Sequence, residues 1–235
     1  MPLRIAHRGA SGTHPENTMA AFHRAIELGS HGIEFDVQRT MDGHLVVIHD
    51  AFVDRTTNGT GLVMAMTLEE VRALDAGSKK GPEFAGERIP TLRELIRGTP
   101  SDCLLFLELK AGSIHFKGIE QELVALLREE GALGRTQVSS FDHHALKLLH
   151  ELEPNLALGM LFTANLLNPV ALAKEIGADA LHPAWEWVTE EMVTAAHAAG
   201  LKVNTWTVNH PVAAMRVQAF GVDGIMTDYP DLIQG

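Results

Sequence analysis

The 235-residue chain contains a single cysteine, Cys103, so neither an intrachain disulfide framework nor a cysteine metal cluster can form. It has no apolar run of about 18 residues or more, and we therefore predict no transmembrane helix. Basic residues are also few, because 19 lysines and arginines stand against 30 aspartates and glutamates, a formal net charge of −11. This balance argues against binding to nucleic acid or to an anionic membrane, but it allows an anionic small molecule in a locally positive pocket.

The N-terminal sequence MPLRIAHRGA has no charged segment followed by an apolar stretch and a small-residue cleavage site. We therefore expect a cytoplasmic location. The glycine-rich fingerprint of dinucleotide-binding folds is missing from the first turn, and the phosphate loop of nucleotide hydrolases does not occur. Apolar residues make up 46% of the chain, which is ample for a buried core. No linker or repeat divides the chain, and so we predict one domain over residues 1–235.

Short apolar runs alternate with longer amphipathic stretches, which predicts strands followed by helices. The strands are predicted at residues 3–7, 32–37, 103–110, 136–140, 157–161, 180–182, 202–207 and 224–227. The helices are predicted at residues 17–28, 92–96, 119–130, 143–152, 170–176, 190–199 and 212–220. An extra strand over 45–49 follows the hairpin signal Asp42-Gly43, and an irregular insertion occupies about 51–88. Eight βα units of this length favour an α/β fold, a (β/α)8 TIM barrel, over an open doubly wound sheet.

Ionisable residues gather at the ends of the first predicted strands, where the active sites of barrels lie. Glu34 and Asp36 lie two residues apart and therefore point to the same side of their strand, and Glu108 ends the next barrel strand. Three carboxylates that converge at a barrel mouth need cationic partners or a metal ion. Because all three offer oxygen ligands, the expected metal is one divalent cation, Mg²⁺ or Ca²⁺, rather than zinc.

Cationic and titratable groups end the same strands. Arg8 offers a planar fork that matches phosphate, and Lys110 offers a point charge. The imidazole group of histidine titrates near neutral pH in general, and so His7 and His49 suit general acid and general base roles. Each residue taken alone also fits a structural role, and the grouping at neighbouring strand ends is what indicates a site. Trp206 ends a later strand and is a candidate wall of the substrate pocket.

At these residues the sequence resembles the glycerophosphodiester phosphodiesterase family. The resemblance rests on short motifs in a specific order, at 6–9 (AHRG), 15–18 (PENT), 34–37 (EFDV), 47–50 (VIHD), 54–59 (DRTTNG), 89–92 (IPTL), 107–110 (LELK), 203–209 (VNTWTVN) and 221–230 (GVDGIMTDYP). These motifs span essentially the whole chain. The family implies a (β/α)8 barrel with a small insertion, and the hydrolysis of glycerophosphodiesters such as glycerophosphocholine or glycerophosphoethanolamine to glycerol 3-phosphate and an alcohol.

The resemblance also implies residue roles at matching positions. His7 and His49 become the acid–base pair, and the metal ligands become Glu34, Asp36 and Glu108. The substrate contacts become Arg8 and Lys110 at the phosphate, with Trp206 near the glycerol. Glu16 and Asn17 are motif positions too, and for Asn17 both helix capping and support of the site are open. The expected partner is a small-molecule glycerophosphodiester, with no nucleic acid, no membrane and a possible homo-oligomer.

Three functions fit these residues. The phosphodiesterase is favoured over a related barrel lyase of the phospholipase type, which would prefer lipid substrates, and over a catalytically silent barrel that binds a phosphodiester. The nucleophile is open between water and the substrate's own hydroxyl next to the ester oxygen, whose attack would have the geometric advantage of an intramolecular reaction. We favour the hydroxyl because the resemblance to related barrel phosphodiesterases implies this route.

Overall fold

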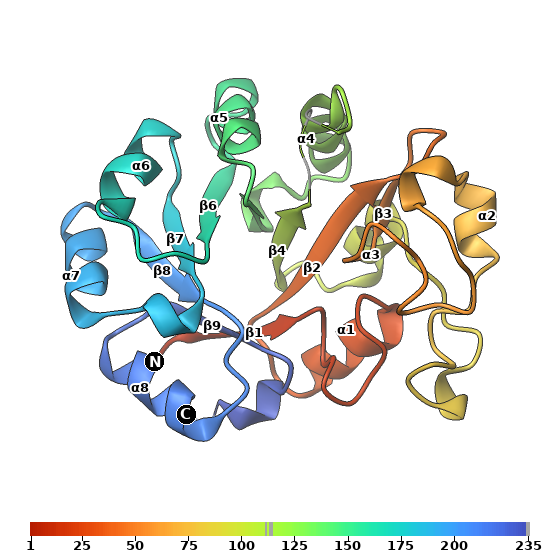
Figure 1. The fold of residues 1–235 in the computed structure, drawn as a ribbon, viewed down its shortest axis with the longest axis horizontal. Helices are drawn as coiled ribbons and strands as arrows, with labels where there is room; N and C mark the ends of the chain where they lie inside the picture. Colours follow the sequence, from red (N-terminus) through yellow and green to blue (C-terminus); the bar gives the residue numbers. More distant parts are fainter. Residues whose placement is uncertain (111, 113–114, 234–235) are drawn as a thin grey trace.

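Parallel strands close into a barrel in the computed structural model, which describes residues 1–110, 112 and 115–233 (Figure 1). Within these residues the barrel strands are β1 (Leu3–His7), β2 (Gly32–Arg39), β4 (Leu104–Leu109), β5 (Thr136–Ser140), β6 (Ala157–Phe162), β7 (Ala180–Pro183), β8 (Lys202–Thr205) and β9 (Gly224–Thr227). β1 pairs with β9 on one side and with β2 on the other, so the sheet closes on itself. The predicted (β/α)8 barrel is thereby confirmed.

Helices surround the barrel on its outer side (Figure 1). They are α1 (Met19–Glu27), α2 (Leu68–Arg72), α3 (Leu92–Gly98), α4 (Ile119–Glu129), α5 (His143–Leu152), α6 (Pro169–Glu175), α7 (Glu190–Ala198) and α8 (Pro211–Ala219). Threonines begin several of them, and Thr91 with Glu94 forms a reciprocal capping box at the start of α3. The described helices are too short and too polar to span a membrane.

The insertion differs from its prediction. The extra strand β3 (Leu45–Val47) pairs antiparallel with the far end of β2 and is shorter than the predicted 45–49. The segment 51–88 is not wholly irregular, because it contains α2, which begins with a capping box between Thr67 and Glu70. This helix of five residues is too short to produce a clear hydrophobic period, which is why the sequence pattern missed it.

Strand β2 is buried on both faces, and its two faces differ in chemistry. Ile33, Phe35 and Val37 are fully buried on the outer face, where the Phe35 ring meets Phe22 of α1 edge to face at 6.1 Å. The alternate residues Glu34 and Asp36 therefore point into the barrel. Because a parallel strand inside such a fold is covered on both sides, the polar residues of β2 are enclosed along with the apolar ones.

The barrel interior also holds a small polar cluster. His182 of β7 is fully buried, and its Nε2 lies 2.9 Å from Oε1 of Gln137 and 3.2 Å from Nδ2 of Asn204. The Nδ1 atom of His182 is buried without a hydrogen-bond partner. His182 is thus part of β7, and its side chain lies inside the barrel.

Burial lowers the pKa of His182 to about 3, and this makes a prediction about acid stability. Below about pH 6.5 the unfolded chain binds a proton at this residue that the folded chain does not, so stability falls with decreasing pH. Between about pH 6.5 and pH 5 we expect this residue to cost the folded state up to about 2 kcal/mol. This loss is absent in His182→Gln. Urea unfolding at several pH values should therefore show that the free energy of unfolding of the wild type, relative to that of the variant, decreases towards pH 5.

The exposed His144 of α5 provides the control for this measurement. His144→Gln keeps the buried His182, and its stability should therefore fall towards pH 5 as that of the wild type does. A constant difference between His182→Gln and the wild type across this range would contradict the buried neutral state of His182.

Candidate active site

The carboxyl ends of β1, β2 and β4 bring the predicted polar residues together. The strand register places His7 beside Glu34 and Asp36 beside Glu108. One ligand oxygen from each of Glu34, Asp36 and Glu108 lies within 4.8 Å of the others. The backbone pairing of adjacent strands therefore fixes the spacing of these side chains.

Burial and mutual repulsion control the ionisation of the three carboxylates. Burial, and then the charges of Asp36 and Glu108, raise the pKa of Glu34 well above its usual range. Burial and the charge of Asp36 raise the pKa of Glu108 to about 7. Burial acts against ionisation of Asp36 as well, but Lys110 and Arg8 outweigh it and keep the pKa of Asp36 below its ordinary value.

Two cationic side chains are buried against this cluster. Nζ of Lys110 lies 2.7 Å from Oε1 of Glu108 and 3.3 Å from Oδ1 of Asp36. Nε of Arg8 lies 3.4 Å from Oδ2 of Asp36, and its backbone N–H donates to Glu34 at 3.0 Å. Two cations thus balance three carboxylates only in part. Arg8 and Lys110 contact the carboxylates here. The same region is where a bound phosphate group would require cationic side chains.

The backbone turn after β1 aims Arg8 at the cluster. Arg8 has φ +56°, in the left-handed region that non-glycine residues seldom adopt, and Gly9 follows with φ +80°. A Cβ atom at Gly9 would lie 2.6 Å from the carbonyl carbon of Ala21 in α1, so only glycine fits this close approach.

The carboxylate cluster fits a divalent cation. Oδ1 of Asp36 is buried and accepts no hydrogen bond, and Nζ of Lys110 lies 3.3 Å away as an ion-pair partner, so this oxygen can still act as a ligand. The donor set consists of carboxylate oxygens alone, which suits a hard cation. Burial and the neighbouring carboxylate charges raise the pKa of Glu34 and of Glu108, so added positive charge would favour their ionised forms. A divalent ion would supply that charge.

His7 is held by an aspartate that the sequence analysis did not assign. Nδ1 of His7 lies 2.6 Å from Oδ1 of Asp228, which directly follows β9, and Asp228 also accepts hydrogen bonds from Ser11 and Asn209. Nε2 of His7 faces the carboxylates, 3.9 Å from Oε2 of Glu34. Asp228 could have been found, since it ends a strand in the same way as the assigned residues.

His49 has the same arrangement at the other side of the site. Its Nδ1 lies 2.6 Å from Oδ1 of Asp50, which leaves its Nε2 free of that contact. Arg55 donates to both oxygens of Asp50 and to both oxygens of Glu16. Glu16 in turn accepts from Arg8 at 2.9 Å. A chain of ion pairs therefore links the insertion to the strand ends.

Asn17 supports a carboxylate and does not cap a helix. Its Nδ2 donates to Oδ2 of Asp36 at 2.8 Å, and its backbone has φ +57°. The cap of α1 is Thr18, whose side chain accepts from the backbone N–H of Ala21. The alternative of helix capping by Asn17 is therefore wrong, because the amide is used to hold Asp36 in place.

Trp206 lies just beyond the end of β8, which stops at Thr205 rather than at the predicted residue 207. Its indole N–H donates to the carbonyl of His182 at 2.8 Å, and its ring meets Phe141 edge to face at 5.6 Å. Phe141 follows β5 and its side chain is 44% exposed. Trp206 thus forms part of an aromatic pair, and its contact with glycerol remains a prediction.

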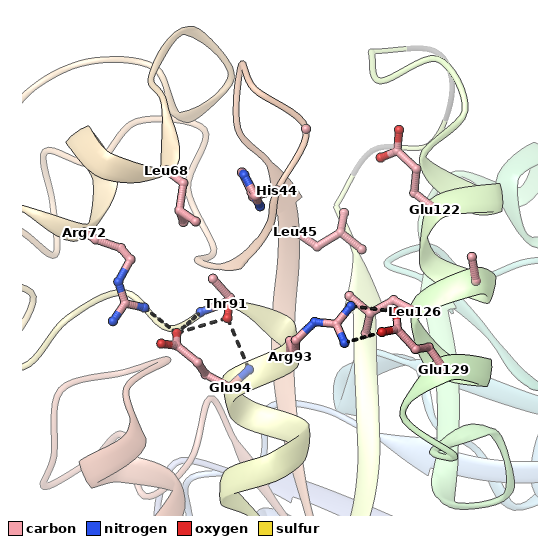
Figure 2. A pocket seen from close by; sticks show the side chains of 12 residues that line it. His44, Leu45, Leu68, Arg72, Thr91, Arg93, Glu94, Glu122, Leu126 and Glu129 are labelled. Carbon is pink, nitrogen blue, oxygen red and sulfur yellow. Dashed lines mark hydrogen bonds and ion pairs between the residues drawn. The ribbon is translucent and has the colours of Figure 1, made fainter.

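A hollow of about 770 Å³ on the flank of the barrel contains none of these residues (Figure 2). It lies between the β2–β3 turn, α2, α3 and α4, and its walls include His44 and Leu45. Arg72 pairs there with Glu94, and Arg93 pairs with Glu129. The hollow therefore differs in its chemistry from the site at the carboxyl ends of β1, β2 and β4.

The model of the glycerophosphoryl diester phosphodiesterase family matches residues 7–232 of this chain. The chain belongs to this family. It is therefore an enzyme of the phosphodiesterase class, as the motifs predicted. A curated glycerophosphodiester phosphodiesterase of Caldanaerobacter subterraneus is 46% identical over 232 residues, which cover 98% of this chain and 96% of the relative. A putative glycerophosphodiester phosphodiesterase of Bacillus subtilis, YhdW, is 42% identical over 97% of this chain and 95% of its own length.

Solved structures agree with this assignment. A phosphodiesterase of Oleispira antarctica, in complex with the product sn-glycerol-3-phosphate, superposes with a TM-score of 0.88 at 35% identity. The superposition covers 98% of this chain and 94% of the other. A putative glycerophosphoryl diester phosphodiesterase of Silicibacter pomeroyi gives a TM-score of 0.87 at 32% identity, over 98% and 91% of the two chains.

The carboxylate cluster makes a prediction about metal binding. We expect titration calorimetry to show one Mg²⁺ or Ca²⁺ per chain, bound less tightly as the pH falls from about 8 to about 6. The direction follows because burial raises the pKa of Glu34 and Glu108, so the ion must displace protons that these groups bind more strongly at low pH. Asp36→Ala should abolish binding, and Asp102→Ala, which removes an exposed carboxylate, should not. Binding to Asp36→Ala, or an affinity that does not change with pH, would contradict the site.

Proposed function

We propose that this enzyme hydrolyses glycerophosphodiesters to sn-glycerol 3-phosphate and an alcohol by acid–base catalysis between two histidines. The observation that carries the proposal is the meeting of His7 and His49 with three carboxylates and two buried cations at one end of the barrel. The product bound in the Oleispira antarctica phosphodiesterase supports the same chemistry for this relative of similar fold.

The histidine–aspartate pairs fix which nitrogen can act on the substrate. A carboxylate accepts a hydrogen bond, so Asp228 and Asp50 hold the proton of each ring on Nδ1. Nε2 of a neutral ring is then an acceptor, and Nε2 of a protonated ring is a donor. One histidine can therefore take a proton from the attacking hydroxyl, while the other gives a proton to the oxygen of the leaving alcohol.

The charged side chains take the remaining roles. We assign Glu34, Asp36 and Glu108 as ligands of one divalent cation, Mg²⁺ or Ca²⁺, which would neutralise charge and polarise a phosphoryl oxygen. Arg8 and Lys110 are assigned to the phosphate oxygens, because both are already buried beside the cluster. Trp206 is assigned to the glycerol side. We further propose a cytoplasmic location for the enzyme.

A direct test measures glycerol 3-phosphate released from glycerophosphocholine and glycerophosphoglycerol, with and without EDTA. The proposal expects release that EDTA abolishes and that Mg²⁺ or Ca²⁺ restores. Binding of the substrates without release would indicate a silent barrel. Accumulation of a cyclic phosphate as the final product would indicate a lyase.

The two histidines should each contribute strongly to the rate. We expect His7→Ala and His49→Ala to lower kcat by about 10²- to 10⁴-fold each, because each removes one proton transfer. A substrate with an activated leaving group should partly rescue the variant that lacks the acid. The matched control is His144→Ala, which removes an exposed histidine of α5. Wild-type rates in both site variants would end the assignment.

The nucleophile is tested with a substrate that lacks the internal hydroxyl. If the hydroxyl next to the ester oxygen attacks phosphorus, the new O–P bond forms as the bond to the alcohol breaks, and water opens the cyclic phosphate in a second step. We therefore expect the 2-deoxy analogue to bind competitively and to react at least about 100-fold more slowly. Hydrolysis of the analogue at the normal rate would instead establish direct attack by water.

A further inference from the structure

Another cavity, of about 310 Å³, opens directly beside the candidate site. His49 and Lys110 form one side of it, and Lys110 also contacts the carboxylate cluster. The other walls include Ala51 and Met64 of the insertion and Phe116 from the segment after β4. The cavity therefore joins the reacting centre to the insertion, on the side of His49.

The described walls of this cavity combine apolar side chains with the cation Lys110 and a few neutral polar groups. Met64 lies in the short 3₁₀ turn Val63–Ala65 and is 45% exposed, so it presents apolar surface to the opening. No aspartate or glutamate is among the described residues that line the cavity. The described carboxylates that contact these lining residues already have cationic or histidine partners: Asp50 is paired with Arg55 and His49, and Glu108 and Asp36 are paired with Lys110. A cationic ligand would find no free counter-charge here.

The remaining polar wall does not change this balance. Gln38 uses its amide N–H groups on the carbonyls of Ile48, His49 and Asp50, so it holds the backbone of the wall in place. His115 is exposed at the edge. Phe116 is only 9% exposed and is a single ring, whereas recognition of a quaternary ammonium group typically uses a cage of several aromatic rings.

We propose that this cavity binds the alcohol half of the substrate and selects an uncharged alcohol with an apolar portion over a cationic one such as choline. This inference rests on the proposed function. Transfer of an ammonium group from water into such a cavity costs hydration and returns no ion pair, and the group would lie near Lys110. An uncharged alkyl group gains from contact with Met64, Ala51 and Phe116. The volume corresponds to about ten water molecules of liquid, enough for a short alkyl alcohol.

The first test compares two esters of glycerol 3-phosphate that have the same shape. One is glycerophosphocholine, and the other carries 3,3-dimethylbutanol, in which carbon replaces the charged nitrogen. We expect kcat/KM to be about tenfold higher for the uncharged ester, although its alcohol is the poorer leaving group. In a series of n-alkyl esters, each added methylene should raise kcat/KM by about two- to fourfold until the cavity is full.

The second test changes the charge of the cavity wall. The relevant quantity is the ratio of kcat/KM for the choline ester to kcat/KM for the 3,3-dimethylbutanol ester. Met64→Glu should raise this ratio at least about tenfold, and Met64→Lys should lower it. The matched control is Met215→Glu on α8, which adds the same charge at a residue that is 61% exposed and lies outside the cavity. This control should leave the ratio unchanged.

Each outcome has a separate meaning. A wild-type preference for the choline ester, or a ratio that responds equally to Met64→Glu and Met215→Glu, would overturn the inference while leaving the hydrolysis intact. Absence of glycerol 3-phosphate release from every ester by the wild-type enzyme would instead overturn the proposed function. Circular dichroism of each variant separates a loss of fold from a change of selectivity.

Discussion

The buried charge of Asp36 is the constraint on which the candidate site depends. This side chain is wholly enclosed, yet its pKa stays below its ordinary value, because Lys110 and Arg8 offset the effect of burial. Each partner comes from a different part of the chain: Arg8 follows β1, Lys110 follows β4, and Asn17 precedes α1. A buried carboxylate without partners would cost several kcal/mol, so these three segments are held together at the mouth. The backbone strain at Arg8 and Asn17, both with positive φ, is offset by the same contacts.

Much of this arrangement could be predicted because strands obey simple rules. Alternation along β2 puts Glu34 and Asp36 on one face, and parallel pairing brings the ends of β1 and β4 beside them. Strands such as β1 and β5 were predicted with their observed ends, because each is a short apolar run followed by a turn. The barrel followed from the alternation of elements rather than from any single residue.

The missed features depend on contacts between residues far apart in the sequence. Asp228 and His7 are 221 residues apart, and only closure of the barrel through the β1–β9 pair makes them neighbours. For Asn17, which lies just before a helix, the sequence left capping and support of the site both open, and the contact with Asp36 decides for support. Helix α2 was not predicted because its five residues are too few to show a hydrophobic period. Its capping box between Thr67 and Glu70 was nevertheless a local signal of a helix start.

The barrel and the insertion divide the work of the site between them. The barrel strands and the residues that directly follow them supply the groups proposed for the metal and the phosphate, and one histidine. The backbone hydrogen bonds of the sheet leave these groups little freedom. The insertion supplies Arg55 and Met64, which lie on a loop region held to the barrel through Glu16 and Gln38. Exchange of Met64 alters a cavity wall without disturbing a strand, whereas exchange of Asp36 would unbalance the charges of the mouth. The insertion and the strand ends meet only at the edge of the cavity. Selectivity for the alcohol, which depends on the insertion, can therefore vary in this fold independently of the reaction at phosphorus, which depends on the strand ends.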